Sequence, residues 1–447
     1  MKLSLENKKI LVIGLASSGL AAIKLMHHFG ANDITLTERK EIKDFEGLEK
    51  LGVKFVKQSD EVFNEHYDLV IKNPGVPPVS PFLKTLKDNG ALIITEMELA
   101  YHFIKPQHLF AITGSNGKTT ATTILYKLLK GQYGDKALVG GNIGTPFCDL
   151  VMQHHLYEEC GYYIALEISN AQLVDIVDFK ANYATITNLS PDHIDFMGGL
   201  DNYYLSKTRI YENMRKGDLF LINKDDELLA KYLKRVPLHS DYLTFSTLND
   251  DADIYWKDEY LYLNDEVILA KNDVKVPGRH NLENIMIACT MAYKAKVDKD
   301  VIEEVISSFK GVEHRIEFVR ELDGVRYYND SKGTNTDATI TALKAFDKNV
   351  ILLVGGYEKG LSMDELKKYL KPVKAVIGFG DSGDRIAHEL FNEQAIVCHD
   401  LEEAMKEVNK IKKNGDIVLL SPTTSSFDQY SCFEERGDHF KKIVNNL

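Results

Sequence analysis

The sequence has few of the features that mark secreted, membrane or nucleic-acid-binding proteins. Its 447 residues include only five cysteines, at positions 148, 160, 289, 398 and 432, and no two of them form a CxxC pair. An odd number of unpaired thiols predicts reduced cysteines and a cytoplasmic protein. No apolar run approaches the ~18 residues that a membrane span needs. The basic N-terminal stretch leads into a glycine turn and not into a cleavage site, so we expect no secretory signal.

Basic residues are also fewer than acidic residues. Lysine and arginine number 54 against 66 acidic residues, giving a net charge of -12. An acidic chain lacks the electrostatic footprint of a nucleic-acid-binding protein, although local Lys, Arg and N–H groups can still bind small anions. The hydrophobic share of 44% and the charged share of 27% are those of a globular protein. A chain of this length is too long for one core, so two or three domains are expected.

The first hundred residues alternate strand and helix patterns. "KKILVIG" predicts a buried strand, "LASSGLAAIKLMHHFG" a turn and a helix, and "ITLTE" the next strand, which together indicate a parallel α/β domain. The first turn, Gly14–Gly19, lacks the middle glycine of a dinucleotide fingerprint, while Glu38 stands where a ribose-binding acid would. From these residues alone, a nucleotide site and a plain tight turn both remain open.

A second block begins near Leu109 with the most informative stretch, "AITGSNGKTTATTILYKLLK". Strand, glycine loop, Lys-Thr and helix follow in the order of a phosphate-binding loop. In such a loop, N–H groups and a helix N-terminus hold phosphates, the lysine neutralises them and a hydroxyl ligates Mg²⁺. The first glycine of the common pattern is replaced by Ile112, so the loop is shorter than usual. The alternative is an ordinary turn that caps a helix and leaves Lys118 solvated.

The remaining patterns complete this block and predict a third. A two-stranded pattern with an Asn-Asp turn follows in "DIYWKDEYLYLNDEVIL", and "PGRHNLENIMIACTMAYKA" predicts a helix. A third block starts near Glu313, with strands at "VRYYND", "NVILLVGG", "KAVIGFG" and "DIVLLSP", and with a helix start at Asp428. We therefore expect domains at residues 1–97, 98–312 and 313–447.

Several residues at expected strand ends suggest chemistry. Glu167 ends "YYIALEIS", where ligands of open α/β sheets bind, and with the Thr119 hydroxyl it offers hard oxygens to Mg²⁺. His193 follows another strand and is an unusual Mg²⁺ ligand. Lys207 lies in a helical pattern, where a solvent-exposed position is the alternative. Loops of the third block carry Arg315, Asp330, Lys332, Thr334 and Lys359.

In their order, these strings resemble the Mur ligase family, the ATP-dependent amide-forming enzymes of peptidoglycan precursor synthesis. The strings are "TGSNGKTT", "GGNIGTP", "LEIS", "SPDHID", "SKTRIY", "GRHNLENIMIA", "EHRIE", "NDSKGTNTDAT" and "LLSPTTSSFDQYSCFEERGDHF". They span all three blocks, and the last is most similar to the member that adds D-glutamate to UDP-N-acetylmuramoyl-L-alanine. Two departures are "EISNAQL", where that member usually has Ser-Ser-Phe-Gln, and Ala16, where glycine is common.

The resemblance implies an α/β fold of three domains: a Rossmann-like N-terminal domain that binds the UDP-substrate, a central P-loop-type ATPase domain and a C-terminal Rossmann-like open sheet that binds the amino acid. It also implies a catalytic set and an ATP site. The catalytic set is Lys118, Glu167, His193, Lys207 and Lys332. The ATP-binding residues are Gly114, Ser115, Asn116, Gly117, Lys118, Thr119, Thr120, Asn142, Asn281, Asn284, Arg315 and Asp330.

The implied cofactors are ATP and two Mg²⁺ ions. The metal set is Thr119, Glu167, His193 and Lys207, the last as a carbamate formed with CO₂, because an ammonium cannot ligate a cation. The uridine nucleotide is expected at Ser17, Ser18, Thr37, Arg39, Asn73 and Gly75, and D-glutamate at Thr334, Lys359, Ser426, Phe427 and Phe433.

The expected reaction joins D-glutamate to UDP-N-acetylmuramoyl-L-alanine through an acyl phosphate, in the cell-wall synthesis on which cell shape and division depend. We expect a monomer. Another Mur ligase is the nearest alternative. A folylpolyglutamate synthase-like ligase would lack the uridine-binding first domain, and a non-catalytic nucleotide-binding module would not need the intact set of Lys118, Glu167, His193 and Lys207.

Overall fold

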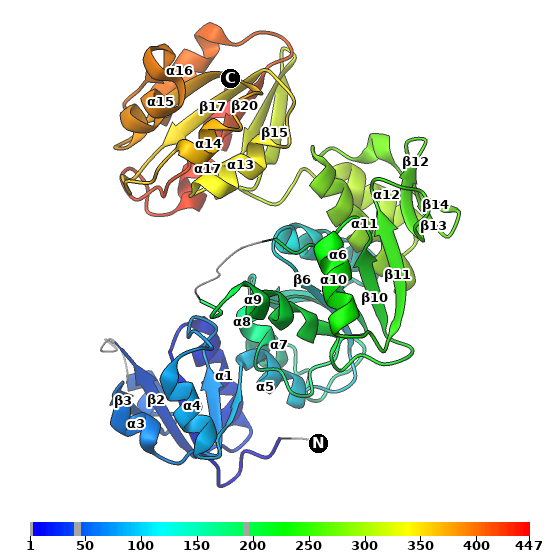
Figure 1. The fold of residues 1–447 in the computed structure, drawn as a ribbon, viewed down its shortest axis with the longest axis vertical. Helices are drawn as coiled ribbons and strands as arrows, with labels where there is room; N and C mark the ends of the chain where they lie inside the picture. Colours follow the sequence, from blue (N-terminus) through cyan, green and yellow to red (C-terminus); the bar gives the residue numbers. More distant parts are fainter. Residues whose placement is uncertain (1–2, 40–45, 191–195) are drawn as a thin grey trace. The chain divides into compact units, whose positions relative to one another are not determined.

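The computed structural model describes residues 3–39, 46–190 and 196–447. The chain folds into two compact α/β units, each described here by itself (Figure 1). The first comprises Met1–Lys271 and Glu283–Val305, and the second comprises Asn272–Leu282 and Ile306–Leu447. Across the described ranges, no helix has both the length and the apolar character needed to span a membrane.

The first unit starts with a five-stranded parallel sheet in the order β3-β2-β1-β4-β5. Its strands are β1 Lys9–Ile13, β2 Asp33–Glu38, β3 Val53–Lys57, β4 Leu69–Lys72 and β5 Leu92–Ile94. The helices between them are α1 Ser17–His28, α2 Glu46–Glu49, α3 Asp60–Asn64 and α4 Pro81–Asp88. Apolar strands such as β1 suit this sheet, because a parallel sheet is covered on both faces.

The second sheet of this unit has nine strands in the order β14-β13-β12-β11-β10-β9-β6-β8-β7. The strands are β6 His108–Thr113, β7 Ala137–Gly141, β8 Tyr163–Glu167, β9 Tyr183–Ile186, β10 Leu219–Asn223, β11 Asp241–Ser246, β12 Ile254–Lys257, β13 Tyr260–Leu263 and β14 Glu266–Ala270. The helices are α5 Glu96–His102, α6 Lys118–Tyr133, α7 Phe147–Gln153, α8 Asn170–Leu173, α9 Leu200–Thr208, α10 Glu227–Arg235, α11 Arg279–Lys294 and α12 Lys299–Ser308. Strands β6 to β12 pair in parallel, and β13 and β14 are antiparallel.

The prediction of two strands at residues 253–269 is wrong, because β12, β13 and β14 form two consecutive hairpins. The second turn is the expected Asn264-Asp265. The first is Asp258-Glu259, with φ of 46° and 65°. Positive φ at both positions is the requirement of a type I′ hairpin turn, and an Asp-Glu pair gives little sequence signal for that conformation.

The two sheets of the first unit share one apolar core, in which α1 and α5 pack against α7. A buried ion pair adds to this junction: Lys72 Nζ, at the end of β4, lies 3.0 Å from Asp175 Oδ2 after α8. Neither side chain is more than 7% exposed. Breaking such a pair leaves an uncompensated charge, so this contact ties the first sheet to the second.

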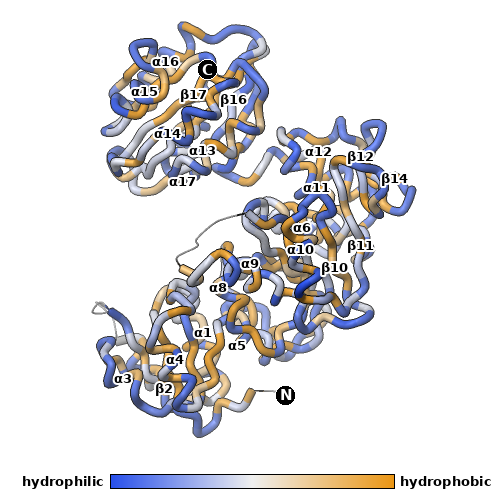
Figure 2. Tube along the Cα trace, in the orientation of Figure 1, coloured by the Kyte–Doolittle hydropathy of each residue, from blue (hydrophilic) through white to orange (hydrophobic). Residues whose placement is uncertain are grey.

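The second unit contains a six-stranded sheet in the order β15-β16-β20-β17-β18-β19. The strands are β15 Glu317–Leu322, β16 Val325–Asn329, β17 Val350–Gly355, β18 Val373–Phe379, β19 Ile396–Val397 and β20 Ile417–Leu420. The helices are α13 Thr336–Leu343, α14 Asp364–Lys367, α15 Gly383–Phe391, α16 Leu401–Ile411 and α17 Phe433–Asn445. All six residues of β17 are buried, within a sheet that has an apolar core on each face (Figure 2).

The predicted helix start at Asp428 is wrong, because α17 begins at Phe433. Residues 427–429 form a turn, in which the N–H groups of Gln429 and Tyr430 both donate to Ser426 O. The Asp428 carboxylate accepts from Asp381 N at 3.2 Å and so does not cap the helix. The α/β class with three sheets is confirmed, whereas the boundaries at 97/98 and 312/313 stay predictions.

Candidate functional site

Two glycines fix the shape of the loop between β6 and α6. Gly114 has φ of 145°, and a Cβ there would lie 1.9 Å from Thr187 Oγ1. Gly117 has φ of 85°, and its Cβ would lie 2.4 Å from Asn284 Oδ1. Only glycine fits both the backbone conformation and the space at these positions. The expected strand, loop and helix are confirmed, with Ile124, Leu125, Leu128 and Leu129 all buried.

The polar groups of this loop are paired within the protein. Ser115 Oγ donates to Ser190 O at 2.8 Å and lies 3.1 Å from the Tyr203 hydroxyl. Asn116 N donates to Asn188 Oδ1, and Lys118 Nζ donates to the carbonyls of Gly114 and Ser115, each at 2.9 Å. The Lys118 ammonium is therefore folded over the loop at the N-terminus of α6, where the backbone N–H groups favour anions.

Lys207 reaches the same loop from α9. Its side chain is 1% exposed, its Nζ donates to Gly114 O at 2.9 Å, and its Nζ lies 4.5 Å from the ring centre of Tyr203. The alternative of a solvent-exposed helix residue is therefore wrong. A lysine this deeply buried beside a phosphate-binding loop points to chemistry at that loop.

Glu167 and Asn142 meet at the end of β8. Strands β6 and β8 are neighbours, with Ile112 opposite Glu167, so the carboxylate lies at the sheet edge that carries the phosphate loop. Glu167 Oε1 accepts from Asn142 Nδ2 at 2.7 Å, while Glu167 Oε2 is buried with no hydrogen-bond partner. A buried carboxylate oxygen without a donor is a hard ligand in need of a cation, so the residues present fit Mg²⁺.

The two asparagines predicted to bind ATP from α11, Asn281 and Asn284, contact different parts of the protein. Asn284 is 3% exposed and lies against Gly117 of the phosphate loop, whereas Asn281 Nδ2 donates to Pro277 O at 2.6 Å. Thr119 and Thr120 lie in the first turn of α6. His193 lies outside the described residues, so its predicted metal role stays a prediction.

The predicted uridine residues gather at the carboxyl end of the first sheet. Its strand order reverses between β1 and β4, and at this point a Gly14 Cβ would lie 2.9 Å from Asn73 Cβ. Ligands of open parallel sheets bind at such a switch point. Asn73 Oδ1 accepts from Gly75 N at 2.9 Å, which shapes the turn.

The other side chains at this edge are partly free for a ligand. Thr37 is fully buried with an unpartnered hydroxyl, and Asn73 Nδ2 is also buried without an acceptor. Ser17 and Ser18 begin α1, and Arg39 is exposed. Glu38 accepts from the N–H groups of Leu15 and Arg39, at 3.1 and 2.8 Å, so its carboxylate orders the first turn.

In the second unit, the loops after β16, β20 and β17 lie side by side, because these strands are neighbours. Asp330 is 5% exposed and accepts from Ser421 Oγ at 2.7 Å and from Ile316 N at 3.2 Å. Burial raises its pKa to about 7, even though these hydrogen bonds act in the opposite direction. Lys332 and Arg315 are exposed beside it, and Lys332 Nζ lies 5.3 Å from the centre of the Phe433 ring.

The structure brings together some of the residues predicted to bind the amino acid. Lys359 Nζ donates to Thr334 O at 3.5 Å, which joins the loops after β17 and β16. Ser426 is 1% exposed with an unpartnered hydroxyl, while the neighbouring Phe427 is 68% exposed. Phe433 is the first residue of α17.

Three functional candidates escaped the sequence analysis. Thr423 and Ser425 are buried with unpartnered hydroxyls, and Arg436 is fully buried in α17. The Ser/Thr-rich loop that follows a buried strand was a usable signal for the first two. Arg436 gave none, since a charged residue in an amphipathic helix is normally exposed.

The chain matches two domain families. The Mur ligase middle domain matches residues 112–292, and the domain described as "Mur ligase, glutamate ligase domain" matches residues 314–424. These regions include the phosphate loop, Glu167, Lys207 and the loops after β16 and β17.

Similar proteins cover the whole chain. A UDP-N-acetylmuramoylalanine--D-glutamate ligase of Geobacillus sp. (strain WCH70) is 39% identical, over 99% of this chain and 98% of that protein. The protein of the same name from Clostridioides difficile (strain 630) is 37% identical over the full length of both. Among solved structures, the UDP-N-acetylmuramate-alanine ligase of Thermotoga maritima has the same fold, with 20% identity, a TM-score of 0.54 and coverage of 98% of this chain and 100% of that one. The chain belongs to the Mur ligase family.

Proposed function

We propose that the protein is an ATP-dependent ligase that joins D-glutamate to UDP-N-acetylmuramoyl-L-alanine in peptidoglycan precursor synthesis, releasing ADP and phosphate. The observation that carries the proposal is the meeting of Lys118, Lys207 and Glu167 at one glycine loop. It occurs in a chain whose full-length relatives bear the name of this ligase. The cytoplasmic location and the monomeric state expected from the sequence belong to the same proposal.

The phosphate in this reaction activates a carboxylate. The terminal phosphoryl group of ATP passes to the carboxylate of the UDP-substrate, its bond to ADP breaks, and an acyl phosphate forms. The amine of D-glutamate attacks the carbonyl carbon and loses a proton. The tetrahedral intermediate then expels phosphate and leaves an amide.

ATP and a carboxylate repel each other, so the site has to supply positive charge. The Lys118 ammonium and the N–H groups at the start of α6 lie where phosphate oxygens would bind. Glu167 and Thr119 would hold one Mg²⁺ ion, with His193 and Lys207 at a second, and these ions would neutralise the phosphate oxygens. Asn142 keeps the Glu167 carboxylate in place through its amide.

Lys207 would act as a metal ligand in the form of a carbamate. An ammonium has no lone pair and repels a cation, but the neutral amine can add CO₂ and release one proton to give a carbamate anion with two hard oxygens. Addition of CO₂ leaves one N–H on the nitrogen. That N–H can keep the hydrogen bond to Gly114 O, so the buried pose is compatible with the modification.

The substrates divide between the units in this proposal. The uridine nucleotide binds at Ser17, Ser18, Thr37, Arg39 and the Asn73–Gly75 turn of the first unit. D-Glutamate binds at the loops of the second unit that carry Thr334, Lys359 and Ser426, where the Lys359 ammonium can pair with an acidic side chain.

The test is phosphate release from ATP with UDP-N-acetylmuramoyl-L-alanine and one amino acid at a time. D-Glutamate should support turnover, and L-glutamate, L-alanine and L-lysine should not. Equal turnover of a neutral or basic amino acid would overturn the assignment to D-glutamate. Turnover of a folate substrate with glutamate, in place of the UDP-substrate, would favour the folylpolyglutamate synthase-like alternative.

A further inference from the structure

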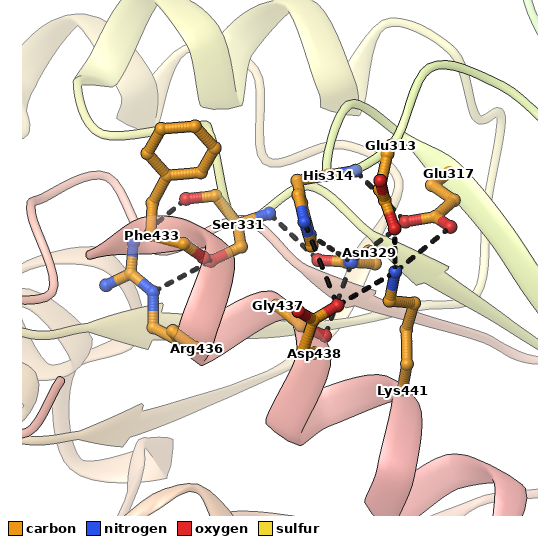
Figure 3. A network of polar contacts seen from close by, with 10 residues as sticks. All are labelled: Glu313, His314, Glu317, Asn329, Ser331, Phe433, Arg436, Gly437, Asp438 and Lys441. Atoms are coloured by element: carbon orange, nitrogen blue, oxygen red, sulfur yellow. Dashed lines mark hydrogen bonds and ion pairs between the residues drawn. The ribbon is translucent and has the colours of Figure 1, made fainter. Parts of the chain in front are cut away.

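Arg436 is a fully buried arginine in the first turn of α17 (Figure 3). Its Nε donates to Ser331 Oγ at 3.0 Å, and its Nη2 donates to Ser331 O at 2.9 Å and to Thr424 O at 3.1 Å. Its Nη1 reaches Gly355 O at 3.5 Å. One guanidinium therefore joins the loops that follow β16 and β20 to the end of β17.

This position is unfavourable for a cation. Burial lowers the pKa of Arg436 to about 10, and the N-terminal turn of a helix repels positive charge. Among the described residues, no carboxylate lies within ion-pair distance, and every acceptor is a carbonyl or a hydroxyl. An uncharged side chain could link the loops by hydrogen bonds without these costs. The presence of a buried charge at this position therefore points to a functional role.

The helix that carries Arg436 is anchored on its next turn (Figure 3). Lys441 Nζ pairs with the carboxylates of Asp438 at 3.0 Å and Glu317 at 3.6 Å, and also with Glu313. A Cβ on Gly437 would lie 2.1 Å from His314 Nδ1, so the helix lies directly on this histidine. The Lys441 ammonium thus pairs with all three carboxylates, and this cluster fixes the place of the helix that carries Arg436.

The segment Thr423–Ser426, which Arg436 contacts through Thr424 O, is strained and contains unpaired hydrogen-bonding groups. Thr423 has φ of 66°, a costly conformation for a β-branched residue. The hydroxyls of Thr423, Ser425 and Ser426 are buried without partners, whereas the Thr424 hydroxyl donates to Tyr357 O. Within the described part of the chain, the backbone N–H groups of these four residues have no acceptor either.

We propose that Arg436 is a positioning residue for the incoming amino acid. It holds Thr423–Ser426 in the strained form, in which the hydroxyls of Thr423 and Ser425 are free to bind a carboxylate of that amino acid beside Ser426. A carboxylate fits because it only accepts hydrogen bonds, and every free group of the segment can donate. The buried guanidinium behind the segment favours the same negative charge. The inference rests on the proposed ligase function and adds Thr423, Ser425 and Arg436 to it.

The experiment measures KM for D-glutamate, with ATP and UDP-N-acetylmuramoyl-L-alanine saturating, and separately KM for ATP. Arg436→Lys keeps the charge but loses the forked donor set. It should raise KM for D-glutamate by about 10-fold or more, because hydrogen bonds to a charged group have energies of this order. KM for ATP should stay within about 2-fold, since the phosphate loop is unchanged. Ser425→Ala should raise KM for D-glutamate in the same selective way.

Thr423→Gly separates this role from a structural one. Glycine adopts positive φ without strain, so the melting temperature should rise while KM for D-glutamate also rises. A purely structural threonine would give a stability change with no change in KM. This variant also keeps the proposal testable if Arg436→Lys fails to fold.

Arg320→Met is the matched control. Arg320 also donates to main-chain carbonyls of α17, those of Val444 and Asn445, but ~12 Å further along the helix at 1.5 Å per residue. It should leave both KM values unchanged. Unchanged KM for D-glutamate in Arg436→Lys and Thr423→Gly, or equal rises for D-glutamate and ATP, would overturn the inference while a working wild-type ligase stands. A wild-type enzyme that does not use D-glutamate would overturn the proposed function itself.

Discussion

Two loops of this protein follow buried parallel strands and carry polar side chains, yet they differ in how many of their polar groups have hydrogen-bond partners. In the Gly114–Gly117 loop, Ser115 is bonded to Ser190 and Tyr203, and Asn116 to Asn188. In the Thr423–Ser426 loop of the second unit, three of four hydroxyls are buried without a partner. The polar side chains of the first loop have hydrogen-bond partners within the protein, whereas most hydroxyls of the second loop have none.

The difference in pairing indicates how each loop would respond to a bound ligand. A loop whose donors and acceptors are paired keeps its shape before the ligand arrives, which is the preorganisation that electrostatic catalysis uses. Each unpaired buried polar group costs on the order of 1–3 kcal/mol. The second loop therefore gives up stability that a bound carboxylate would restore.

The largest expected effect tests the chemistry of the first loop. Lys118→Ala should lower kcat by ~10²–10³-fold, the usual loss for one electrostatic contact to developing charge. The fold should remain, because the Lys118 ammonium donates to carbonyls of its own loop and is not part of the apolar core. Steady-state phosphate release and a thermal melt check both parts. More than about a tenth of the wild-type activity would argue against the phosphate-loop assignment.

The next effect tests the residue that reaches this loop from α9. Lys207→Ala should be inactive, and acetate should partly restore turnover by supplying the carboxylate that the carbamate would have placed there. Lys207→Arg should not respond to acetate, because its guanidinium keeps the charge and fills the space. Activity is measured with and without ~0.1–0.5 M acetate, and chloride at equal ionic strength serves as the salt control. Equal responses to acetate and chloride would contradict the carbamate role.

A smaller effect concerns the pH dependence of stability that a buried carboxyl group contributes in each unit. The pKa values of Asp330 and Glu96 are both raised by burial to about 7, from ordinary values near 4. Between these pH values the folded protein keeps a proton that the unfolded chain releases, so the stability of each unit should fall as pH rises from about 4 to 7.

Asp330→Asn should remove much of this fall for the second unit, by on the order of 2–4 kcal/mol across the range. Glu96→Gln should do the same for the first unit. Urea denaturation at pH 4.5 and 7.5, followed separately for the two units, measures the slope. A slope that Asp330→Asn leaves unchanged would show that this carboxyl group is already ionised below neutral pH.

The smallest effect tests the contrast between the loops directly. Ser115→Ala removes the hydrogen bonds that Ser115 Oγ makes with Ser190 O and the Tyr203 hydroxyl, and it should destabilise the protein by about 1–2 kcal/mol. Ser425→Ala removes a buried hydroxyl that has no partner, so it should be neutral or stabilising by up to about 1 kcal/mol. Urea unfolding of both variants without ligands gives the comparison. Equal destabilisation would mean that the two loops do not differ as described.

Much of the fold was predictable because local patterns dictate it. The buried face of α6 follows from apolar residues at helical spacing, and strands such as β1 and β17 follow from short apolar runs. The wrong predictions of secondary structure fall where the backbone adopts a conformation that the residue types do not favour. Asp258-Glu259 form a hairpin turn, and the segment at Asp428 forms a turn before α17.

The site was predictable to the extent that its residues stand at strand ends. The position of Glu167 beside the phosphate loop follows from the pairing of β8 with β6. Burial was not predictable in the same way. Lys207 has the pattern of a helix-surface residue, and only the packing of α9 against the loop reveals that it is buried.

By itself, the sequence determined the α/β class, the glycine loop that opens α6 and the order of motifs that resembles the Mur ligases. These are local properties, because propensity, periodicity and turn chemistry act over a few residues. Only the tertiary structure decided which polar groups are paired and which are left free. Pairing depends on residues distant in the chain, as when Arg436 joins Ser331, Gly355 and Thr424, and no local pattern records such contacts.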